Sequence, residues 1–457
     1  MIELAPDRIA ATVGSTEPGP ETEDGSRPER AVIDSREARD GDLFFGLPGE
    51  HQDGGRYAGR ALEQGAWGVV VAREHAAALE RDHAGARVFA VAEPLSALQA
   101  LARAWRRELG CPTVGITGST GKTSVKDICR AILPRRVHAS PENFNTEIGM
   151  PLALLAAPPE TELLVMEMAM RGIGQIADLC EIAEPDVAAI TNIGPVHLEL
   201  LGTLDAIVEA KAEIIHGLGE NGRAVVPEDE EALTPHLRES LEVLTFGAGG
   251  DVFALSASVA GGRTIARIGT QHGEADFEFP FTEAHNLHNA LCAIAIGCAL
   301  DLDPAAMATR TARIEFSRLR GERIELPGRI LLLNDCYNAN PISMRAAVEN
   351  LAGSGSGDEG RTVAVLGGMA ELGPDAADFH AEIGALVRAR GIDRLIGVGE
   401  LARDYSPDVW APDADAAVPV VAAELREGDV ALVKGSRSVG LERLSDGLVA
   451  RLGGAGG

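Results

Sequence analysis

The chain has 457 residues, of which 45% are hydrophobic, and this is enough for about three domains with cores of their own. Its 69 acidic and 41 basic residues give a formal charge of −28, which argues against general nucleic-acid binding, since that requires a basic patch. No apolar run reaches the roughly 18 residues of a membrane span, and the N-terminus lacks a signal pattern. Six cysteines without a CxxC pair, several of them in apolar runs, predict reduced core residues and a cytoplasmic protein.

Three α/β segments are expected in chain order. Residues 1–108 combine short apolar strands with helices and close on a long helix that ends before a Gly-Cys-Pro sequence. Residues 109–312 alternate strands and helices, as is typical of a parallel sheet covered by helices. Residues 313–457 restart this alternation, which predicts a Rossmann-like sheet with a flexible loop at 353–360. The predicted fold class is therefore α/β, with three domains.

The stretch VGITGSTGKTS, residues 114–124, carries the first chemical signal. It departs from the general P-loop pattern, because Ile116 stands where that pattern has glycine. It nevertheless joins a predicted buried strand to a helix N-terminus, which is the context that a phosphate loop requires. Backbone N–H groups would face the phosphates, Lys122 would reach the β- and γ-phosphates, and Thr123 would ligate Mg²⁺. A simple strand–turn–helix would not need Gly-Lys-Thr at this place.

Two further polar residues are expected at the same edge of the central sheet. Glu167 ends the apolar strand LLVMEM, where a carboxylate can hold Mg²⁺ directly or through water. His197 follows the next predicted strand, in the loop of VAAITNIGPVHLELLGT. Each residue alone would be read as an ordinary strand-end charge or an exposed loop histidine. The adjacent phosphate loop favours a functional role for Glu167 and leaves both readings open for His197.

Lysine is rare in this sequence. Only four occur, at Lys122, Lys126, Lys211 and Lys434, and the other 37 basic residues are Arg. Because Arg serves nearly everywhere that a surface cation would do, a retained Lys is a candidate for chemistry that guanidinium cannot perform. The alternative is chance retention.

Lys211 is the most informative of these lysines. It lies three and four positions from Ile207, Val208 and the next apolar residues of a predicted amphipathic helix, on the apolar face. Glu209 and Glu213 are expected on the opposite face, together with Asp205. A desolvated lysine has a lowered pKa and becomes a neutral, reactive amine, whereas the alternative is a stem that reaches past the core to solvent.

These motifs, in this order, resemble those of the Mur ligase family. Thr-Gly-x-x-Gly-Lys-Thr at 117–123 is similar to the phosphate loop of that family, and Glu167, NIGPVHLE and the lysine of EAKAEII continue the match. The match to the family motifs extends towards the C-terminus through HNLHNALCAIAIG, DCYNANPISM and VKGSRSVGLE. The uridine-binding domain of the branch that acts on longer muropeptides is similar to the stretch DSREARDGDLFFGLPGEHQDGG. The branch that adds D-Ala-D-Ala is similar to this chain in two stretches, ENFNTEIGMPLALL and YNANP.

The resemblance implies an ATP-dependent ligase. The carboxylate of UDP-MurNAc-tripeptide would be converted into an acyl phosphate, and the amine of D-Ala-D-Ala would attack it to give the UDP-MurNAc-pentapeptide precursor of peptidoglycan. Thr123 and Glu167 would hold one Mg²⁺. Lys211 resembles the family lysine that CO₂ carbamylates, which would make it a ligand, with His197, for a second Mg²⁺. We expect a monomer that binds these small molecules and no nucleic acid or membrane.

The three segments would then divide the work as a UDP-muropeptide-binding domain at 1–108, an ATP-binding P-loop domain at 109–312 and a ligase domain at 313–457. Catalytic roles fall to Lys122, His197 and Lys211. The resemblance assigns nucleotide contacts to Gly118, Ser119, Thr120, Gly121, Lys122, Thr123, Ser124, Asn289, Arg320 and Asp335. It assigns substrate contacts to Ser35, Arg36, Asn143, Asn338, Lys434 and Arg437.

Two departures and two alternatives accompany this interpretation. Gly54 stands where the family commonly has His, and Gly368 where it usually has Asp. A folylpolyglutamate synthase would share the central and C-terminal domains, but the uridine-domain signature argues against it. A P-loop regulatory ATPase would require Lys211 and YNANP to be incidental. The third peptide residue, meso-diaminopimelate or Lys, stays open, as does D-Ala-D-Lac in place of D-Ala-D-Ala.

Overall fold

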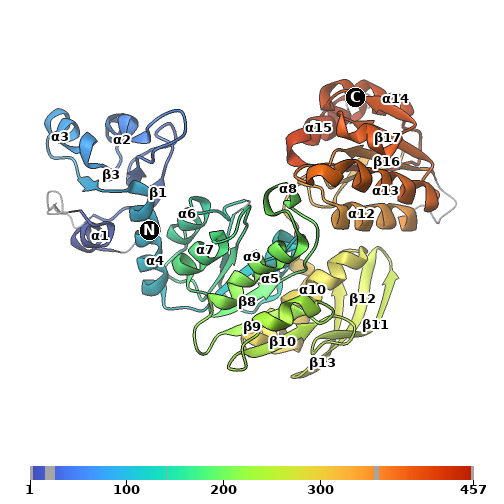
Figure 1. Cartoon of the computed structure of the whole chain (residues 1–457), viewed down its shortest axis with the longest axis horizontal. Helices are drawn as coiled ribbons and strands as arrows, with labels where there is room; N and C mark the ends of the chain where they lie inside the picture. Colours follow the sequence, from blue (N-terminus) through green and yellow to red (C-terminus); the bar gives the residue numbers. More distant parts are fainter. Residues whose placement is uncertain (1–3, 16–25, 142, 355–359, 454–457) are drawn as a thin grey trace.

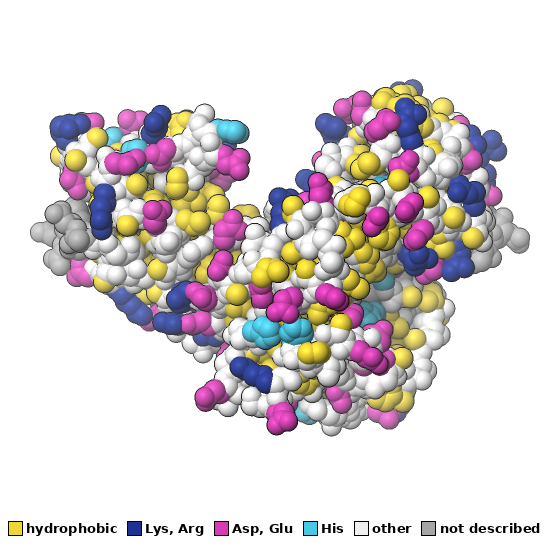
Figure 2. Space-filling view, viewed as in Figure 1, with side chains coloured by type: hydrophobic (Ala, Val, Ile, Leu, Met, Phe, Trp, Pro, Cys, Tyr) yellow, Lys and Arg dark blue, Asp and Glu magenta, His cyan; other side chains and the backbone are white. Residues whose placement is uncertain are grey.

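The computed structural model describes residues 4–15, 26–141, 143–354 and 360–453. These form an α/β structure with sheets in three lobes, and the N-terminal and C-terminal lobes stand apart on either side of a central one (Figure 1). The space-filling view shows open space between the two outer lobes (Figure 2). Most of the predicted flexible loop at 353–360 falls outside the described residues. Among the described helices, none is long and apolar enough to cross a membrane.

The N-terminal lobe is a four-stranded parallel sheet in the order β1-β2-β3-β4. Its last helix, α4, ends at Gly110 with φ +62°, a left-handed C-cap, as the sequence predicts. A 3₁₀ turn, η1, leads directly into the short helix α2. The elements are α1 (Pro6–Val13), β1 (Arg30–Val32), β2 (Asp42–Phe45), η1 (Gly54–Tyr57), α2 (Ala58–Glu63), β3 (Gly68–Ala72), α3 (Arg73–Asp82), β4 (Val88–Val91) and α4 (Pro94–Leu109).

The central lobe is built on a six-stranded parallel sheet in the order β10-β9-β8-β5-β7-β6. Helices α5 and α10 share a core with one face of this sheet, and α4, α7 and α9 share a core with the other. The sheet elements and their helices are β5 (Thr113–Thr117), α5 (Lys122–Ile132), β6 (Val137–Ala139), α6 (Gly149–Leu155), β7 (Leu163–Glu167), α7 (Gln175–Ala183), β8 (Val187–Ile190), α8 (Leu198–Leu201), α9 (Leu204–His216), β9 (Arg223–Pro227), η2 (Glu231–His236), β10 (Glu242–Phe246), α10 (Ala284–Ala299), α11 (Pro304–Ala308) and η3 (Thr311–Arg313).

A second, antiparallel sheet in this lobe was not predicted. Strands β11 (Phe253–Ala260), β12 (Arg263–Thr270) and β13 (Gly273–Phe279) form a three-stranded meander. Along β12, buried Ala266 and Ile268 alternate with exposed residues, so one face packs on the core and the other meets solvent. We expected helices and strands to alternate throughout the central segment, and this expectation is wrong for residues 253–279. In β12 buried and exposed residues alternate one by one, which favours consecutive strands over a helix.

The C-terminal lobe is a six-stranded sheet in the order β14-β15-β19-β16-β17-β18, parallel except for the antiparallel edge strand β14. The domain limits given above stay a prediction. The elements are β14 (Glu322–Leu326), β15 (Ile330–Asn334), α12 (Pro341–Ser354), β16 (Thr362–Gly367), η4 (Gly373–Asp375), α13 (Ala376–Ala389), β17 (Arg394–Val398), η5 (Leu401–Tyr405), β18 (Val409–Ala411), α14 (Ala414–Glu424), β19 (Val430–Lys434), η6 (Arg437–Val439) and α15 (Leu441–Gly453).

Candidate active site

The glycine-rich turn joins β5 to α5 at the carboxyl edge of the central sheet. Gly118 has φ +146° and Gly121 has φ +80°, values that L side chains rarely adopt. A Cβ at Gly118 would also collide with Thr191 Oγ1, and a Cβ at Gly121 would collide with the side chain of Asn289. Ile116 is fully buried within β5, so the turn begins after the position where the general P-loop pattern has its first glycine. Both glycines of the turn are therefore required by its geometry.

The loop after β8 holds this turn in place. Ser119 Oγ donates a hydrogen bond to Gly194 O at 3.0 Å, and the backbone N–H of Thr120 donates to Asn192 Oδ1 at 2.9 Å. Asn192 Nδ2 in turn donates to Thr120 Oγ1 at 2.7 Å. The sequence analysis did not name Asn192, although it lies in the quoted stretch NIGPVHLE. These bonds fix the backbone groups that would meet a phosphate.

Lys122 and Thr123 begin α5 beside this turn. Lys122 Nζ donates to Gly118 O at 2.7 Å, so the amine lies back over its own loop. Burial lowers the pKa of Lys122, and the charge of Glu167 opposes this. Thr123 Oγ1 donates to Glu167 Oε2 at 2.9 Å. A hydroxyl and a carboxylate in contact offer the oxygen ligands that Mg²⁺ prefers, so this pair fits the predicted ion.

Glu167 has two neighbours that the sequence analysis did not assign to the site. Asn145 Nδ2 donates to its Oε1 at 2.9 Å, and Lys126 Nζ lies 4.0 Å from its Oε2. Lys126 is 2% exposed, and burial lowers its pKa while Glu167 and Asp127 oppose that shift. The scarcity of lysine and the quoted stretch ENFNTEIGM are the signals that could have pointed to both residues.

Lys211 lies inside α9 and is 2% exposed, which confirms the predicted burial of its helix face. Burial lowers the pKa of its amine well below the ordinary value, and the nearby Lys122 lowers it further. Within the part of the chain that the structure describes, Lys211 forms no hydrogen bond or ion pair. A buried amine with a lowered pKa, and with no partner among the described residues, is thus held within electrostatic reach of Lys122.

His197 follows β8 and lines the cavity beside the phosphate loop. Its Nδ1 donates a hydrogen bond to the carboxylate of Glu371, 174 residues further along the chain. Burial lowers the pKa of His197, Glu371 raises it, and Lys122 and Lys211 lower it. Glu371 was not predicted as a site residue, although it lies three residues after Gly368, one of the two departures named above.

A cavity of about 970 Å³ lies where the central and C-terminal lobes meet. On the C-terminal side, Lys434 Nζ donates to Asp335 Oδ2 at 2.6 Å and to Asn338 O at 3.1 Å, and Arg320 stacks on the ring of Tyr337 at 4.0 Å. Among the predicted site residues, those that line the cavity are Ser119, Thr120, Gly121, Lys122, Thr123, Ser124, Asn143, Glu167, His197, Asn289, Arg320, Asp335, Asn338 and Lys434.

Five predicted residues do not line this cavity. Gly118 begins the turn whose next residues line it, whereas Lys211 belongs to α9, which contributes no lining residue. Arg437 lies 5.9 Å from the Tyr337 ring. Ser35 is buried and Arg36 is paired with Asp34 in the N-terminal lobe. Ser35 and Arg36 could contact the same substrate as the phosphate loop only if that substrate reached from the N-terminal lobe to the central lobe.

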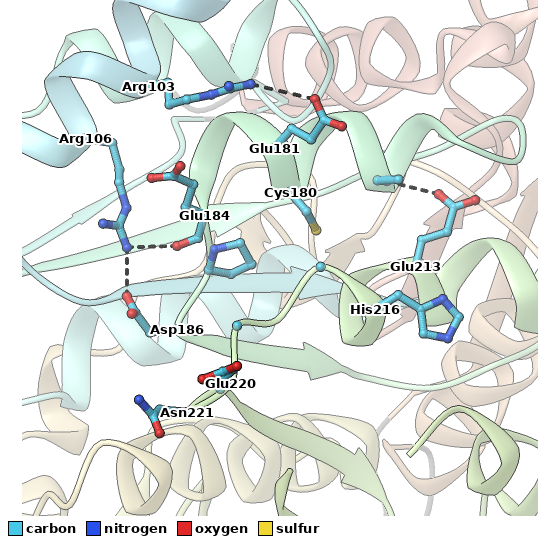
Figure 3. A pocket seen from close by; sticks show the side chains of 15 residues that line it. Arg103, Arg106, Cys180, Glu181, Glu184, Asp186, Glu213, His216, Glu220 and Asn221 are labelled. Carbon is cyan, nitrogen blue, oxygen red and sulfur yellow. Dashed lines mark hydrogen bonds and ion pairs between the residues drawn. The ribbon is translucent and has the colours of Figure 1, made fainter. Parts of the chain in front are cut away.

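A second cavity, of about 820 Å³, lies between α4, α7 and α9 and contains none of the predicted site residues (Figure 3). Two of its charged side chains cap the two ends of α7. Glu213 accepts hydrogen bonds from the backbone N–H groups of Gly174, Ile176 and Ala177, at the N-terminal end. Arg106 donates to the carbonyls of Ala183 and Glu184, at the C-terminal end. The expectation that Glu213 lies on the polar face of α9 is therefore wrong, because the residue is 8% exposed and its carboxylate caps the neighbouring helix.

Comparisons with known proteins agree with this architecture. The chain matches three family descriptions, "Mur ligase family, catalytic domain" at 31–106, "Mur ligase middle domain" at 116–297 and "Mur ligase, glutamate ligase domain" at 319–437. It is 34% identical to the UDP-N-acetylmuramoyl-tripeptide–D-alanyl-D-alanine ligase of Bacillus subtilis, over 98% of this chain and 99% of the relative. The chain belongs to the Mur ligase family.

The same ligase of Mycobacterium tuberculosis is also 34% identical to this Mur ligase, over 98% of each chain. A solved structure of MurF from Acinetobacter baumannii has a TM-score of 0.85 at 27% identity, covering 97% of this chain and 98% of that one. MurF ligase from Thermotoga maritima in complex with ADP has a TM-score of 0.81 at 31% identity, covering 94% and 99%. The three-domain fold is therefore shared with these structures.

In this Mur ligase, the two departures from common family residues sit in tight surroundings. A Cβ at Gly54 would lie 2.6 Å from the carbonyl oxygen of Leu47. A Cβ at Gly368 would lie 2.7 Å from Leu401 Cβ. A histidine or an aspartate at these positions would force a neighbour to move, so the surrounding packing has adapted to glycine.

Proposed function

We propose that this Mur ligase joins D-Ala-D-Ala to UDP-MurNAc-tripeptide with ATP and so makes the pentapeptide precursor of peptidoglycan. Relatives with that printed activity align with 98% of the chain at 34% identity. The observation that carries the proposal is the single cavity in which the phosphate loop, Glu167 and the Asp335–Lys434 pair meet. The match of residues 31–106 to a Mur ligase domain opposes a folylpolyglutamate synthase, since such neighbours share only the fold, at 16% identity.

The residues of the cavity suit the two steps of this reaction. The tripeptide carboxylate attacks the γ-phosphorus of ATP, so that an acyl phosphate forms and ADP leaves. The amine of D-Ala-D-Ala then attacks the acyl carbon, phosphate leaves with one former carboxylate oxygen, and the amine proton is released. Lys122 and the turn would hold the phosphates, with Asn289, Arg320 and Asp335 around the nucleotide. Positioning and neutralisation of charge are the main requirements, because both substrates are anionic.

Two Mg²⁺ ions would supply further neutralisation of the phosphate oxygens. Thr123 and Glu167 would hold one, with both oxygen ligands already in contact. His197 and a carbamylated Lys211 would hold the second. The neutral amine of Lys211 adds to CO₂, forming an N–C bond and releasing a proton, and the product is a carbamate anion. The low pKa and the missing partner of Lys211 support this step, since a guanidinium could not perform it.

The N-terminal lobe would bind the uridine end of the muropeptide through Ser35 and Arg36. Asn143, Asn338, Lys434 and Arg437 would face the peptide and the incoming dipeptide. Because these groups lie in different lobes, we expect the lobes to close when substrates bind. Small-angle X-ray scattering profiles that stay the same with saturating ligands would count against closure.

The chain is proposed to act as a monomer in the cytoplasm. All six cysteines are free and buried, which suits a reducing compartment. Sedimentation of the purified chain at micromolar concentration would reveal a stable dimer, if one forms.

The decisive assay measures phosphate release from ATP with each substrate omitted in turn. Release should require UDP-MurNAc-tripeptide and D-Ala-D-Ala together, and mass spectrometry should detect the pentapeptide. Tripeptides that carry meso-diaminopimelate or Lys, and D-Ala-D-Lac as the second substrate, would define the specificity. Steady ATP hydrolysis indifferent to both substrates would refute the proposed ligase.

A further inference from the structure

One carboxylate of the C-terminal lobe contacts two cavity-lining side chains of the central lobe. Glu371 lies between β16 and η4, and its Oε2 accepts the hydrogen bond from His197 Nδ1. Its Oε1 lies 3.5 Å from Arg171 Nη2. Its backbone carbonyl accepts from the N–H of Glu199 at 3.2 Å, so the segments of the central lobe that follow β7 and β8 both contact this one residue of the C-terminal lobe. We call these contacts the Glu371 clasp.

The backbone at the Glu371 clasp is strained on both sides. His197 has φ +54° and Glu371 has φ +60°, which places two contacting non-glycine residues in the left-handed region. Such a conformation costs about 1 kcal/mol or more at each residue and persists only where the surroundings hold it. Gly373, two residues after Glu371, has φ +70°, also in the left-handed region, and its backbone lies against that of Glu199. The loops are therefore shaped to meet each other.

The hydrogen bond to Glu371 decides which nitrogen of His197 is left for a ligand. A carboxylate can only accept, so Nδ1 is the donor and carries the proton. The Nε2 atom then keeps its lone pair, which is the arrangement by which carboxylates orient metal-binding histidines in proteins. In this chain the orienting carboxylate comes from another lobe than the histidine.

We propose that Glu371 is a positioning residue. Through its hydrogen bond, the orientation of the His197 side chain towards the phosphate-loop cavity depends on the C-terminal lobe being packed against the central lobe. This rests on the proposed function, in which His197 holds a Mg²⁺ ion. When the C-terminal lobe is seated, Glu371 fixes the imidazole and Arg171 completes the clasp. When the lobe moves away, His197 loses its orienting partner and the metal site is weakened.

The test compares Glu371→Ala and Glu371→Gln with His197→Ala and with the double variant Glu371→Ala/His197→Ala. Mn²⁺ replaces Mg²⁺, and its binding to each protein with saturating ADP is measured by electron paramagnetic resonance. Glu371→Ala should weaken Mn²⁺ binding by about 10- to 100-fold, and Glu371→Gln, which keeps an acceptor oxygen, should weaken it less. The double variant should bind Mn²⁺ no more weakly than His197→Ala alone, because Glu371 acts through His197.

Two controls separate positioning from a general structural role. Glu199→Gln removes a charge from the same junction, and the Glu199 side chain has no hydrogen bond or ion pair within the described residues, so Mn²⁺ binding should stay unchanged. The far-UV circular dichroism spectrum of Glu371→Ala should match that of the wild type, since the change is confined to one loop side chain. Small-angle X-ray scattering should show a wider distribution of distances in Glu371→Ala than in the wild type.

Wild-type Mn²⁺ binding in Glu371→Ala, or losses from Glu371→Ala and His197→Ala that simply add, would overturn the proposal. If the variants behave as expected but the wild type makes no pentapeptide, the proposed function fails and the coupling stands. If the wild type ligates and the coupling is absent, only this inference fails.

Discussion

Two cavities of similar size differ in what their charged residues do. In the cavity of Figure 3, Glu213 and Arg106 cap the ends of α7, and Arg106 also pairs with Asp186 at 2.9 Å. In the phosphate-loop cavity, Lys122 has only a carbonyl of its own loop as a hydrogen-bond partner, and the neighbouring Lys211 has none among the described residues. The first cavity thus uses Glu213 and Arg106 for helix capping, whereas in the second carboxylates pair with Lys434 and His197 but Lys122 has no carboxylate of the described residues in hydrogen-bond contact. Volume alone therefore does not distinguish a binding site from a space between helices.

The largest effect is expected at Lys211. Lys211→Ala should reduce ligation by at least about 100-fold, because the charge that would hold the second Mg²⁺ is lost. Added short carboxylates such as acetate should restore part of the activity by supplying the missing oxygen ligand. Lys211→Arg, which keeps a cation but cannot be carbamylated, should be as impaired as Lys211→Ala. Wild-type rates in either variant, measured by phosphate release, would remove the carbamate from the mechanism.

A pair of glycines provides the next test of the comparison. Gly118→Ala should weaken ADP binding by about 10- to 100-fold, since its φ of +146° and the contact with Thr191 exclude a side chain. Gly219→Ala, in the cavity of Figure 3, should have no effect, because nothing lies within 4 Å of the added Cβ. Calorimetry of ADP binding measures both. If both variants bound ADP with the same affinity, the assignment of the glycine-rich turn as the phosphate-binding loop would be contradicted.

A smaller effect, on stability and not on catalysis, is expected at Glu213. Glu213→Ala leaves the N-terminal N–H groups of α7 without their buried acceptor and should destabilise the central lobe by about 1–3 kcal/mol. The turnover number should stay close to that of the wild type at a temperature where the variant is folded. Glu220→Ala, in the same cavity but exposed, is the control and should change neither quantity. Loss of turnover in folded Glu213→Ala would give the Figure 3 cavity a catalytic role.

The smallest effect concerns the thiol of Cys180 in the same cavity. Burial, and then the charge of Glu213, raise its pKa to about 12, so the thiol stays protonated at neutral pH and its thiolate appears only as the pH approaches that value. Iodoacetamide should therefore modify Cys180 very slowly in the native protein at pH 8 and readily after unfolding. Glu213→Ala should raise the native rate slightly, because a negative charge is removed. Rapid labelling of native Cys180, seen by peptide mass spectrometry, would contradict its burial.

Local signals in the sequence predicted most of the central site. The glycines of the phosphate loop, the strand-end Glu167 and the buried face of Lys211 each follow from spacing within one element or one turn. The structure brings the loop and Glu167 together with Asp335 and Lys434 of the C-terminal lobe. The family resemblance had suggested Asp335, and the scarcity of lysine had also pointed to Lys434.

The residues that sequence reasoning missed depend on contacts between distant segments. Asn145 meets Glu167 across a 22-residue separation, and Glu371 meets His197 across 174 residues. Neither contact leaves a periodic signal in the sequence. Glu213 was wrongly expected on the polar face of α9 for a related reason. The periodicity of one helix does not show that the N-terminal end of another helix, α7, lies beside it and needs a hydrogen-bond acceptor. The antiparallel strands β11–β13 were missed because their alternation was read as part of the surrounding helix–strand pattern.

The placement of the lysines has a consequence for chemical modification. Lys126, Lys211 and Lys434 are each 2% exposed and Lys122 is half-buried, so no lysine of this chain is exposed. Lys122 and Lys434 line the nucleotide cavity, whereas Lys126 and Lys211 do not line it and are buried. Acylating reagents and amine-directed cross-linkers would therefore meet Lys122 first, from the cavity. A bound nucleotide would shield this side chain, so its modification would report occupancy of the cavity.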